Sequence, residues 1–247
     1  MLLNIQALQV LNMAQHLQTL SAVFSLSTSE VPMDQWRGSF AALSKDDLLH
    51  QHNTIDGERI KRYPLIQYRK SGAHYSVFGI NQGAELLLKM RSEGLFENYS
   101  LNKKKKKLEI VQWDEKFRQT VDTISTGHWP IYTVNEIIPL HPDNARKYHQ
   151  FQSFHDRVDF VEHQLNNYIV SFAKGVNWTI PKERPVNSKL LDIIKIERIQ
   201  LFGASLLMFD IEFASTALLP EGIGIGRKVA FGHGVVSATG KYRSLIV

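Results

Sequence analysis

The chain has 247 residues, 43% of them hydrophobic, which is enough for one large domain or two small ones with buried cores. It contains no cysteine, so disulfide bonds and cysteine-based zinc sites are excluded. The formal net charge is +5, and after Glu221 the chain has no acidic residue but four basic ones: Arg227, Lys228, Lys241 and Arg243. Local basic zones of this kind indicate a path for a polyanion; ordinary solubilising surface charge is the alternative.

The first twenty residues are apolar and contain no Lys or Arg, whereas a secretory signal peptide begins with positive charge. No stretch approaches the roughly 20 apolar residues that span a bilayer. We therefore expect a cytoplasmic protein without membrane association.

The first half of the chain alternates strand-like and helix-like patterns, with a polar, loop-like segment over Lys45–Ile60. The expected elements are a strand over Leu20–Ser27, a helix over Met33–Ser44 that begins after Pro32, a hairpin of Tyr63–Tyr68 and Ala73–Ile80, a helix capped by Asn81 that ends near Gly94, and a strand over Leu108–Trp113. This order is the βαββαβ pattern of a ferredoxin-like unit.

The second half repeats the mixture of strands, helix and hairpin. We expect strands over Ile131–Pro139, Ile193–Phe202, Ser205–Phe213 and Val235–Val247, and a helix over Asp156–Ala173. The predicted fold class is α+β, with two tandem ferredoxin-like (RRM-like) βαββαβ domains and a C-terminal glycine-rich loop. The predicted domains are residues 1–100, which include an N-terminal extension, and residues 111–247, joined by a lysine-rich linker over residues 101–110.

Several segments together resemble one family. They are Trp36–Phe40, His50–Asn53, Arg62–Tyr68, Gly79–Glu85, Leu165–Gly175 and the pattern Gly224-x-Gly226 followed by Gly232-x-Gly234. They resemble the CRISPR-associated endoribonucleases that process precursor crRNA, the sixth numbered Cas family of the repeat-associated RNA-binding superfamily. The glycine pattern is shared across that superfamily, so Arg62–Tyr68 in order with the other segments is the more specific feature. The resemblance implies metal-independent cleavage without a cofactor, and retention of the guide RNA in an effector complex.

One branch of the family is similar in placing two histidines in the loop after the first helix, where His50 and His52 lie here. Metal-independent cleavage needs a base near the 2′-hydroxyl, an acid near the leaving 5′-oxygen and a cation for the phosphorane, and histidine serves both proton roles near neutral pH. In an extended segment the two side chains lie about 7 Å apart on one face. Lys45, Arg59 or Arg62 could neutralise the transition state, and Tyr63 could position the hydroxyl.

The predicted catalytic residues are therefore His50, His52, Lys45 and Tyr63. Two alternatives remain open: histidines of a loop without a role, and a metal pair completed by Asp46, Asp47 or Asp56. No second metal-like motif accompanies the pair, so we predict no metal site.

The predicted RNA-binding residues lie in two segments. They are Arg59, Lys61, Arg62 and Arg69 in the first half, and Gly224, Gly226, Arg227, Lys228, Gly232, His233 and Gly234 in the glycine-rich segment. Glycine lets backbone N–H groups approach a phosphate closely, so this segment is interpreted as an anion-binding loop facing the histidines across an RNA strand. The alternative is a tight turn before the last strand.

The run Lys103–Lys107 is interpreted as a loop tip between domains, with direct RNA contact as the alternative. The predicted function is metal-independent cleavage of CRISPR repeat RNA within the precursor transcript by 2′-hydroxyl attack, which gives guide RNAs with a 2′,3′-cyclic phosphate and a 5′-hydroxyl. The alternatives are a non-catalytic guide-RNA-binding subunit of a CRISPR effector complex and an unrelated basic protein on the same scaffold. The expected partners are repeat RNA and guide RNA, with other CRISPR effector subunits or a second copy of the chain as open additions.

Overall fold

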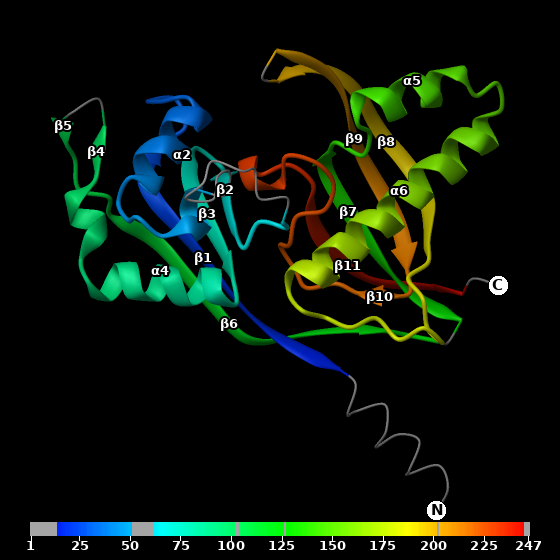
Figure 1. Ribbon diagram of the computed structural model, residues 1–247, viewed down its shortest axis with the longest axis horizontal. Helices are drawn as coiled ribbons and strands as arrows, with labels where there is room; N and C mark the ends of the chain where they lie inside the picture. Colours follow the sequence, from blue (N-terminus) through cyan, green and yellow to red (C-terminus); the bar gives the residue numbers. More distant parts are fainter. Residues whose placement is uncertain (1–13, 51–61, 102–103, 126, 202, 245–247) are drawn as a thin grey trace, which may run out of the picture. The chain divides into compact units, whose positions relative to one another are not determined.

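The computed structural model describes residues 14–50, 62–101, 104–125, 127–201 and 203–244, and its contacts divide the chain into two compact units (Figure 1). The N-terminal unit holds Leu17–Arg118 together with Ala230–Gly232. The C-terminal unit holds Gln119–Val229 and the chain from His233 onwards. The predicted linker, residues 101–110, falls within the N-terminal unit, where Leu108 is buried in the core. The domain limits at residues 100 and 111 stay a prediction.

Strands and helices alternate in both units. The strands are β1 (Gln15–Ser27), β2 (Ile66–Ser71), β3 (His74–Ile80), β4 (Ser100–Leu101), β5 (Lys104–Lys105), β6 (Ile110–Thr123), β7 (His128–Ile137), β8 (Ser188–Leu201), β9 (Ala204–Ser215), β10 (Ala217–Leu218) and β11 (Val235–Ser244). The helices are α2 (Met33–Ala41), α3 (Asp47–His50), α4 (Gln82–Ser92), α5 (Pro142–Gln150) and α6 (Phe154–Gly175), and the 3₁₀ turns are η1 (Leu95–Asn98) and η2 (Val229–Phe231).

The N-terminal unit has the βαββαβ order that the sequence predicted. Its four long strands are arranged β6-β1-β3-β2, so that strands numbered in chain order read 4-1-3-2. The predicted hairpin is present as β2–β3: Ser71 pairs with His74, and the turn lies at Gly72 and Ala73. Helix α2 connects the first two strands and α4 begins directly after the third. This connectivity confirms a ferredoxin-like fold for the unit.

An aromatic cluster forms the core of the N-terminal unit. Trp36 on α2 is fully buried, stacks on Tyr75 with the ring centroids 5.2 Å apart, and packs at 5.7 Å from Phe24 of β1. Phe40, one turn further along α2, packs against the same Phe24 at 5.5 Å. The spacing of four residues therefore places both aromatic side chains on the sheet-facing side of α2. Truncating such a buried aromatic residue to alanine costs roughly 3–5 kcal/mol.

The C-terminal unit repeats the same strand order. Its sheet is arranged β11-β7-β9-β8, which again reads 4-1-3-2 in chain order. Helix α6 covers this sheet with a buried face of Val161, Leu165, Ile169 and Phe172. Ser153 begins α6 by accepting a hydrogen bond from the N–H of His155 at 3.1 Å. The duplicated ferredoxin-like fold, inferred without a sequence repeat, is thus confirmed.

Two local predictions were wrong. The segment over Lys45–Ile60 was interpreted as a loop, but Asp46 caps the short helix α3 by accepting from the N–H of Leu48 at 2.9 Å. Asn81 precedes α4 without capping it, because its side-chain oxygen accepts from the N–H of Gln18 at 3.1 Å instead. Of the lysine run, Lys104 and Lys105 form β5, which pairs with β4, whereas Lys106 and Lys107 belong to no strand. Helix α5 was not predicted.

Among the residues that the structure describes, no helix combines the length and the apolar character needed to cross a membrane.

Candidate active site

His50 ends helix α3 in the N-terminal unit, and its side chain is exposed. Its ring Nε2 lies 3.1 Å from the carbonyl oxygen of Ser44. A carbonyl oxygen can only accept, so Nε2 carries the proton and donates it to this bond. The other ring nitrogen, Nδ1, is then the one left to take up or release a proton. The Ser44 contact fixes both the orientation and the tautomer of the ring.

Arg37 on α2 holds the main chain at the same place. Its Nη2 donates to the carbonyl oxygen of His50 at 3.1 Å. The guanidinium carbon lies 4.7 Å from the ring centroid of Phe231 and 5.8 Å from that of Tyr68. Burial lowers the pKa of Arg37, the neighbouring Tyr68 opposing this in part. Arg37 thus joins α3 to the 3₁₀ turn η2 within the N-terminal unit.

Tyr68 of β2 lies beneath this arrangement. Its side chain is fully buried and its hydroxyl donates to the carbonyl oxygen of Leu49 at 3.1 Å. Burial raises the pKa of Tyr68 far above its usual range. The rings of both Tyr63 and Tyr68 lie in the interior of the unit.

Gly232 lies against the main chain of β2. Its φ is +85°, and a Cβ added there would lie 2.8 Å from the carbonyl oxygen of Tyr68 and 3.1 Å from Cα of Arg69. A larger residue would therefore clash with backbone as well as being strained. Contacts within the N-terminal unit thus connect three of the predicted residues, His50, Arg69 and Gly232. Arg37 bonds the carbonyl of His50, and Tyr68 bonds that of Leu49 next to it. Gly232 in turn lies against the main chain of Tyr68 and Arg69.

Arg69 is a half-buried cation beside these contacts. Its guanidinium carbon lies 4.1 Å from the ring centroid of Phe78, and it donates a hydrogen bond to Gln67 Oε1. Burial lowers the pKa of Arg69 to about 10, so the side chain stays positively charged at neutral pH. An arginine stacked on an aromatic ring is a fixed positive charge rather than a mobile one.

The other three catalytic candidates, Lys45, Tyr63 and His52, differ in their surroundings. Lys45 is exposed between α2 and α3, five residues before His50. Tyr63 is 8% exposed, and its hydroxyl accepts from Gln67 Nε2 at 2.9 Å, so a role in positioning a ribose hydroxyl stays a prediction. His52 lies outside the described residues, as do the RNA-binding candidates Arg59 and Lys61.

Arg62 lies in an acidic setting. It lines a hollow of about 460 Å³ with Asp46, Asp47 and Glu85, among others. The three carboxylates outnumber the two cations of the hollow, Arg62 and Lys89, which disfavours a phosphate at this place. RNA binding by Arg62 stays a prediction without local electrostatic support.

The glycine-rich segment of the C-terminal unit is held by its own backbone. Gly222 and Ile225 donate their N–H groups to the carbonyl oxygens of Val236 and Gly234, at 2.9 and 2.8 Å, and Gly224 bridges to Val235. Gly234 has φ +73°, and a Cβ there would lie 1.9 Å from the carbonyl oxygen of Ile225. The structure therefore gives this stretch a packing role, as the tight-turn alternative expects.

The polar residues of the same segment also have neighbours. Gly226 has φ +101°. Arg227, which follows it, donates its backbone N–H to the carbonyl oxygen of Ile138 at 3.0 Å. The Arg227 side chain lies beside Tyr168, whose pKa is raised by burial and partly lowered again by this cation. Lys228 is half-buried with φ +61°. His233 Nδ1 lies 3.6 Å from Glu136 Oε2. The amides already bonded to carbonyl oxygens offer nothing to an anion, so the anion-binding interpretation rests on the remaining ones and stays a prediction.

Arg37 is the residue that the sequence reasoning missed. It belongs to the quoted segment Trp36–Phe40, but charge and spacing alone gave it no role because its neighbours on α2 are core residues. The available signal was a lone arginine between two buried aromatic residues of one helix. Among the described residues, no group of three or more His, Asp or Glu side chains has the arrangement of a metal site.

The fold, with two 4-1-3-2 sheets in one chain, defines a tandem ferredoxin-like protein. Two domain models match the chain: the Cas6b N-terminal domain over residues 15–119 and the Cas6b C-terminal domain over residues 125–239. Together they cover most of the sequence, and the chain belongs to the Cas6b family. No curated protein sequence matches it.

Solved structures of similar fold are consistent with this assignment. A structure described as Cas6b superposes with a TM-score of 0.73 at 20% identity, and one described as the CRISPR RNA processing endoribonuclease Cas6b with 0.66 at 19%; each comparison covers 91% of this chain and 100% of the other. Csf5, described as a type IV Cas6 crRNA endonuclease, gives 0.60 at 10% identity over 91% of this chain and 99% of its own. At these identities the likeness establishes the shared fold.

Proposed function

We propose that this protein is a metal-independent endoribonuclease that cleaves CRISPR repeat RNA within the precursor transcript to release guide RNAs. Membership of the Cas6b family supports the substrate. The observation that carries the chemistry is His50: an exposed imidazole whose Nε2–H is engaged by Ser44, which leaves Nδ1 as the reactive nitrogen.

The reaction needs no external nucleophile. The ribose 2′-oxygen attacks the adjacent phosphorus as a base removes its proton, and a bond forms between them. The bond from phosphorus to the 5′-oxygen breaks, and an acid protonates that oxygen. The products are a 2′,3′-cyclic phosphate and a 5′-hydroxyl. The base and the acid each contribute roughly 10²–10⁴-fold to the rate.

His50 supplies one of the two proton-transfer groups, and we assign the other to His52. Lys45, Arg37 and Arg69 provide positive charge in the same unit for the extra negative charge of the phosphorane. Arg37 acts as a positioning residue, because its hydrogen bond is to the carbonyl of His50 rather than to a reacting atom.

The test is incubation with labelled repeat RNA in excess chelator, comparing the intact protein with the His50→Ala/His52→Ala variant. We expect the intact protein to give one cut with a cyclic phosphate end, and the variant to bind RNA without cutting it. A requirement for a divalent ion would contradict the mechanism. Tight binding without a cut by the intact protein would favour the guide-RNA-binding subunit instead.

A further inference from the structure

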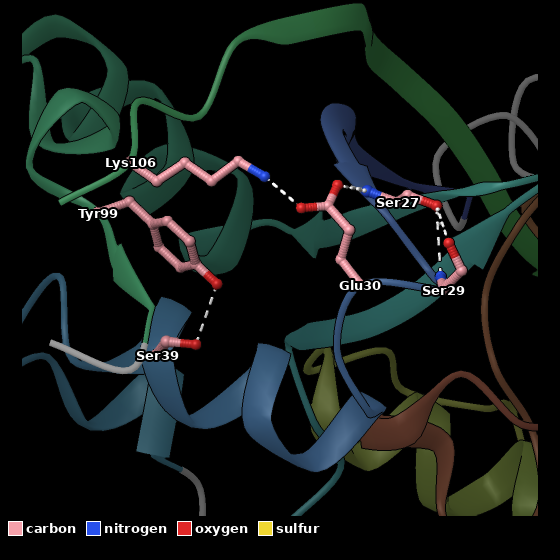
Figure 2. Close-up of polar contacts among 6 residues, drawn as sticks. All are labelled: Ser27, Ser29, Glu30, Ser39, Tyr99 and Lys106. Atoms are coloured by element: carbon pink, nitrogen blue, oxygen red, sulfur yellow. Dashed lines mark hydrogen bonds and ion pairs between the residues drawn. The ribbon is translucent and has the colours of Figure 1, made fainter. Parts of the chain in front are cut away.

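The described lysines of the run at residues 104–107 divide into two pairs with different surroundings. Lys106 forms an ion pair with Glu30, and Lys107 lies 3.6 Å from Glu97. Figure 2 shows the Lys106 side chain reaching across to Glu30, whose other carboxylate oxygen accepts from the N–H of Ser27 at 3.0 Å. These two lysines therefore attach the chain to the body of the N-terminal unit.

The base of the β4–β5 hairpin is fixed by further bonds. The hydroxyl groups of Tyr99 and Ser39 are hydrogen-bonded at 3.1 Å, which ties the hairpin to α2 (Figure 2). Lys106 donates its N–H to the carbonyl oxygen of Tyr99 at 2.9 Å, and Leu108 donates its own to Phe96 at 3.1 Å. Tyr99 is fully buried. The hairpin is thus a supported projection of the unit.

Lys104 and Lys105 differ from their neighbours. They form β5, both are exposed, and in the part of the chain that the structure describes neither makes an ion pair. Protein–protein interfaces are depleted in lysine, whereas lysine is a regular contact of nucleic-acid phosphates. Two unneutralised lysines on a supported hairpin therefore fit a phosphate backbone better than a protein partner.

The hairpin lies across α2 from the candidate active site. Arg37 and Ser39 are two residues apart, which places them about 200° apart around the helix. Arg37 contacts the site and Ser39 contacts the hairpin base. The outer face of α2 between them carries the exposed residues Asp34, Gln35, Gly38 and Ala42, and nothing lies within 4 Å of a Cβ built at Gly38. The two places are about one helix diameter, 10–12 Å, apart.

We propose that Lys104 and Lys105 bind backbone phosphates of the RNA strand that continues from the scissile phosphate over the outer face of α2. This rests on the proposed function for the identity of the RNA. The hairpin adds affinity through charge and takes no part in the chemical step. It therefore contributes to the salt dependence of binding and leaves the cleavage rate of bound RNA unchanged.

The test is the salt dependence of repeat-RNA binding for Lys104→Gln/Lys105→Gln. Losing two contacts to single-stranded RNA lowers the slope of log K against log salt by about 1.4, which weakens binding about 25-fold at 0.1 M salt. The control Lys174→Gln/Lys182→Gln removes the same charge from exposed positions in the C-terminal unit and should leave the slope unchanged. Lys104→Arg/Lys105→Arg should also bind like the intact protein. The single-turnover cleavage rate at saturating protein should be the same for all four.

An unchanged slope in the glutamine variant, or an equal fall in the control, would overturn the proposal. A lower cleavage rate at saturation would do so too, because it would place the lysines in the chemical step. If the intact protein binds repeat RNA without cutting it, the proposed function fails, and the slopes still decide the role of the hairpin.

Discussion

The two units share one strand order but close their sheets differently. In the N-terminal unit helix α4 leads from the third strand towards the fourth, whereas in the C-terminal unit the glycine-rich segment lies between β9 and β11 in the chain. A helix satisfies its backbone internally, while the glycine-rich segment depends on pairing with Gly234–Val236. The comparison shows that the helix before the last strand of this fold can be replaced by a glycine-rich segment. Such a segment lets the backbone lie in direct contact with neighbouring segments of the chain.

The first test of this comparison asks whether proton transfer belongs to the N-terminal unit. His50→Ala should lower the single-turnover cleavage rate of repeat RNA about 10²–10⁴-fold, because one proton-transfer group is lost. RNA affinity should change little. The control is His155→Ala on α6, an exposed histidine of the C-terminal unit paired with Asp159, which should cleave normally. Equal rates for the two variants would show that His50 has no chemical role.

The second test concerns the packing of the glycine-rich segment. Gly234→Ala should lower the free energy of unfolding by roughly 2–5 kcal/mol, from backbone strain and overpacking combined, since the added Cβ would meet the carbonyl oxygen of Ile225 at 1.9 Å. The matched control is Gly240→Ala, where φ is +71° and nothing lies within 4 Å, so only the strain of about 1–2 kcal/mol remains.

Denaturant titration of both glycine variants measures the difference. A Gly234→Ala variant as stable as Gly240→Ala would mean that the glycine-rich segment is not held in this close pairing. The contrast between this segment and helix α4 would then lose its support.

The third test addresses Arg37 as a positioning residue. Arg37→Ala should lower kcat about 10- to 100-fold with a smaller change in KM, because His50 loses a support of its main chain. The pH dependence of the rate should keep its shape, since the titrating groups remain. Arg91→Ala is the control: it removes an arginine whose guanidinium lies 4.5 Å from the ring centroid of Trp113 in the same unit. A change confined to KM would make Arg37 an RNA-binding residue instead.

The smallest expected effect belongs to the hairpin, a further feature of the N-terminal unit. The hydrogen bond from Lys106 is the main reason that the pKa of Glu30 is lowered. Because the pKa of Glu30 is lower in the folded state, its carboxylate stabilises the fold at pH values above the unfolded-state pKa of about 4.3. This stabilisation is lost as the pH falls through the folded-state pKa. Lys106→Ala should therefore cost less than about 1 kcal/mol at pH 7, and nothing in acid below both values.

The unfolding free energies at pH 7 and in acid test this prediction. Lys89→Ala, which removes an exposed ion pair to Glu93 at 3.9 Å, serves as the control and should show a smaller pH dependence. A cost for Lys106→Ala that persists in acid would assign its effect to packing.

The sequence predicted the fold well because periodicity is a local property. The helix over Trp36 and Phe40 and the hairpin around Gly72 each depend on neighbouring residues only. The contacts of Asn81 were missed because its partner, Gln18, lies 63 positions away. The sequence predicted only part of the candidate site. His50 followed from the family resemblance, whereas the place of Arg37 depends on its contact with Phe231, which no local pattern encodes.

The residues Ala230–Gly232 belong to the N-terminal unit although they come almost at the end of the chain. Phe231 covers Arg37, and Gly232 fits against Tyr68. A fragment that stops at Arg118 would lack this cover, and the surroundings of Arg37 and Tyr68 would be incomplete in it. During synthesis these surroundings are therefore completed only once residues 230–232 have been added to the chain.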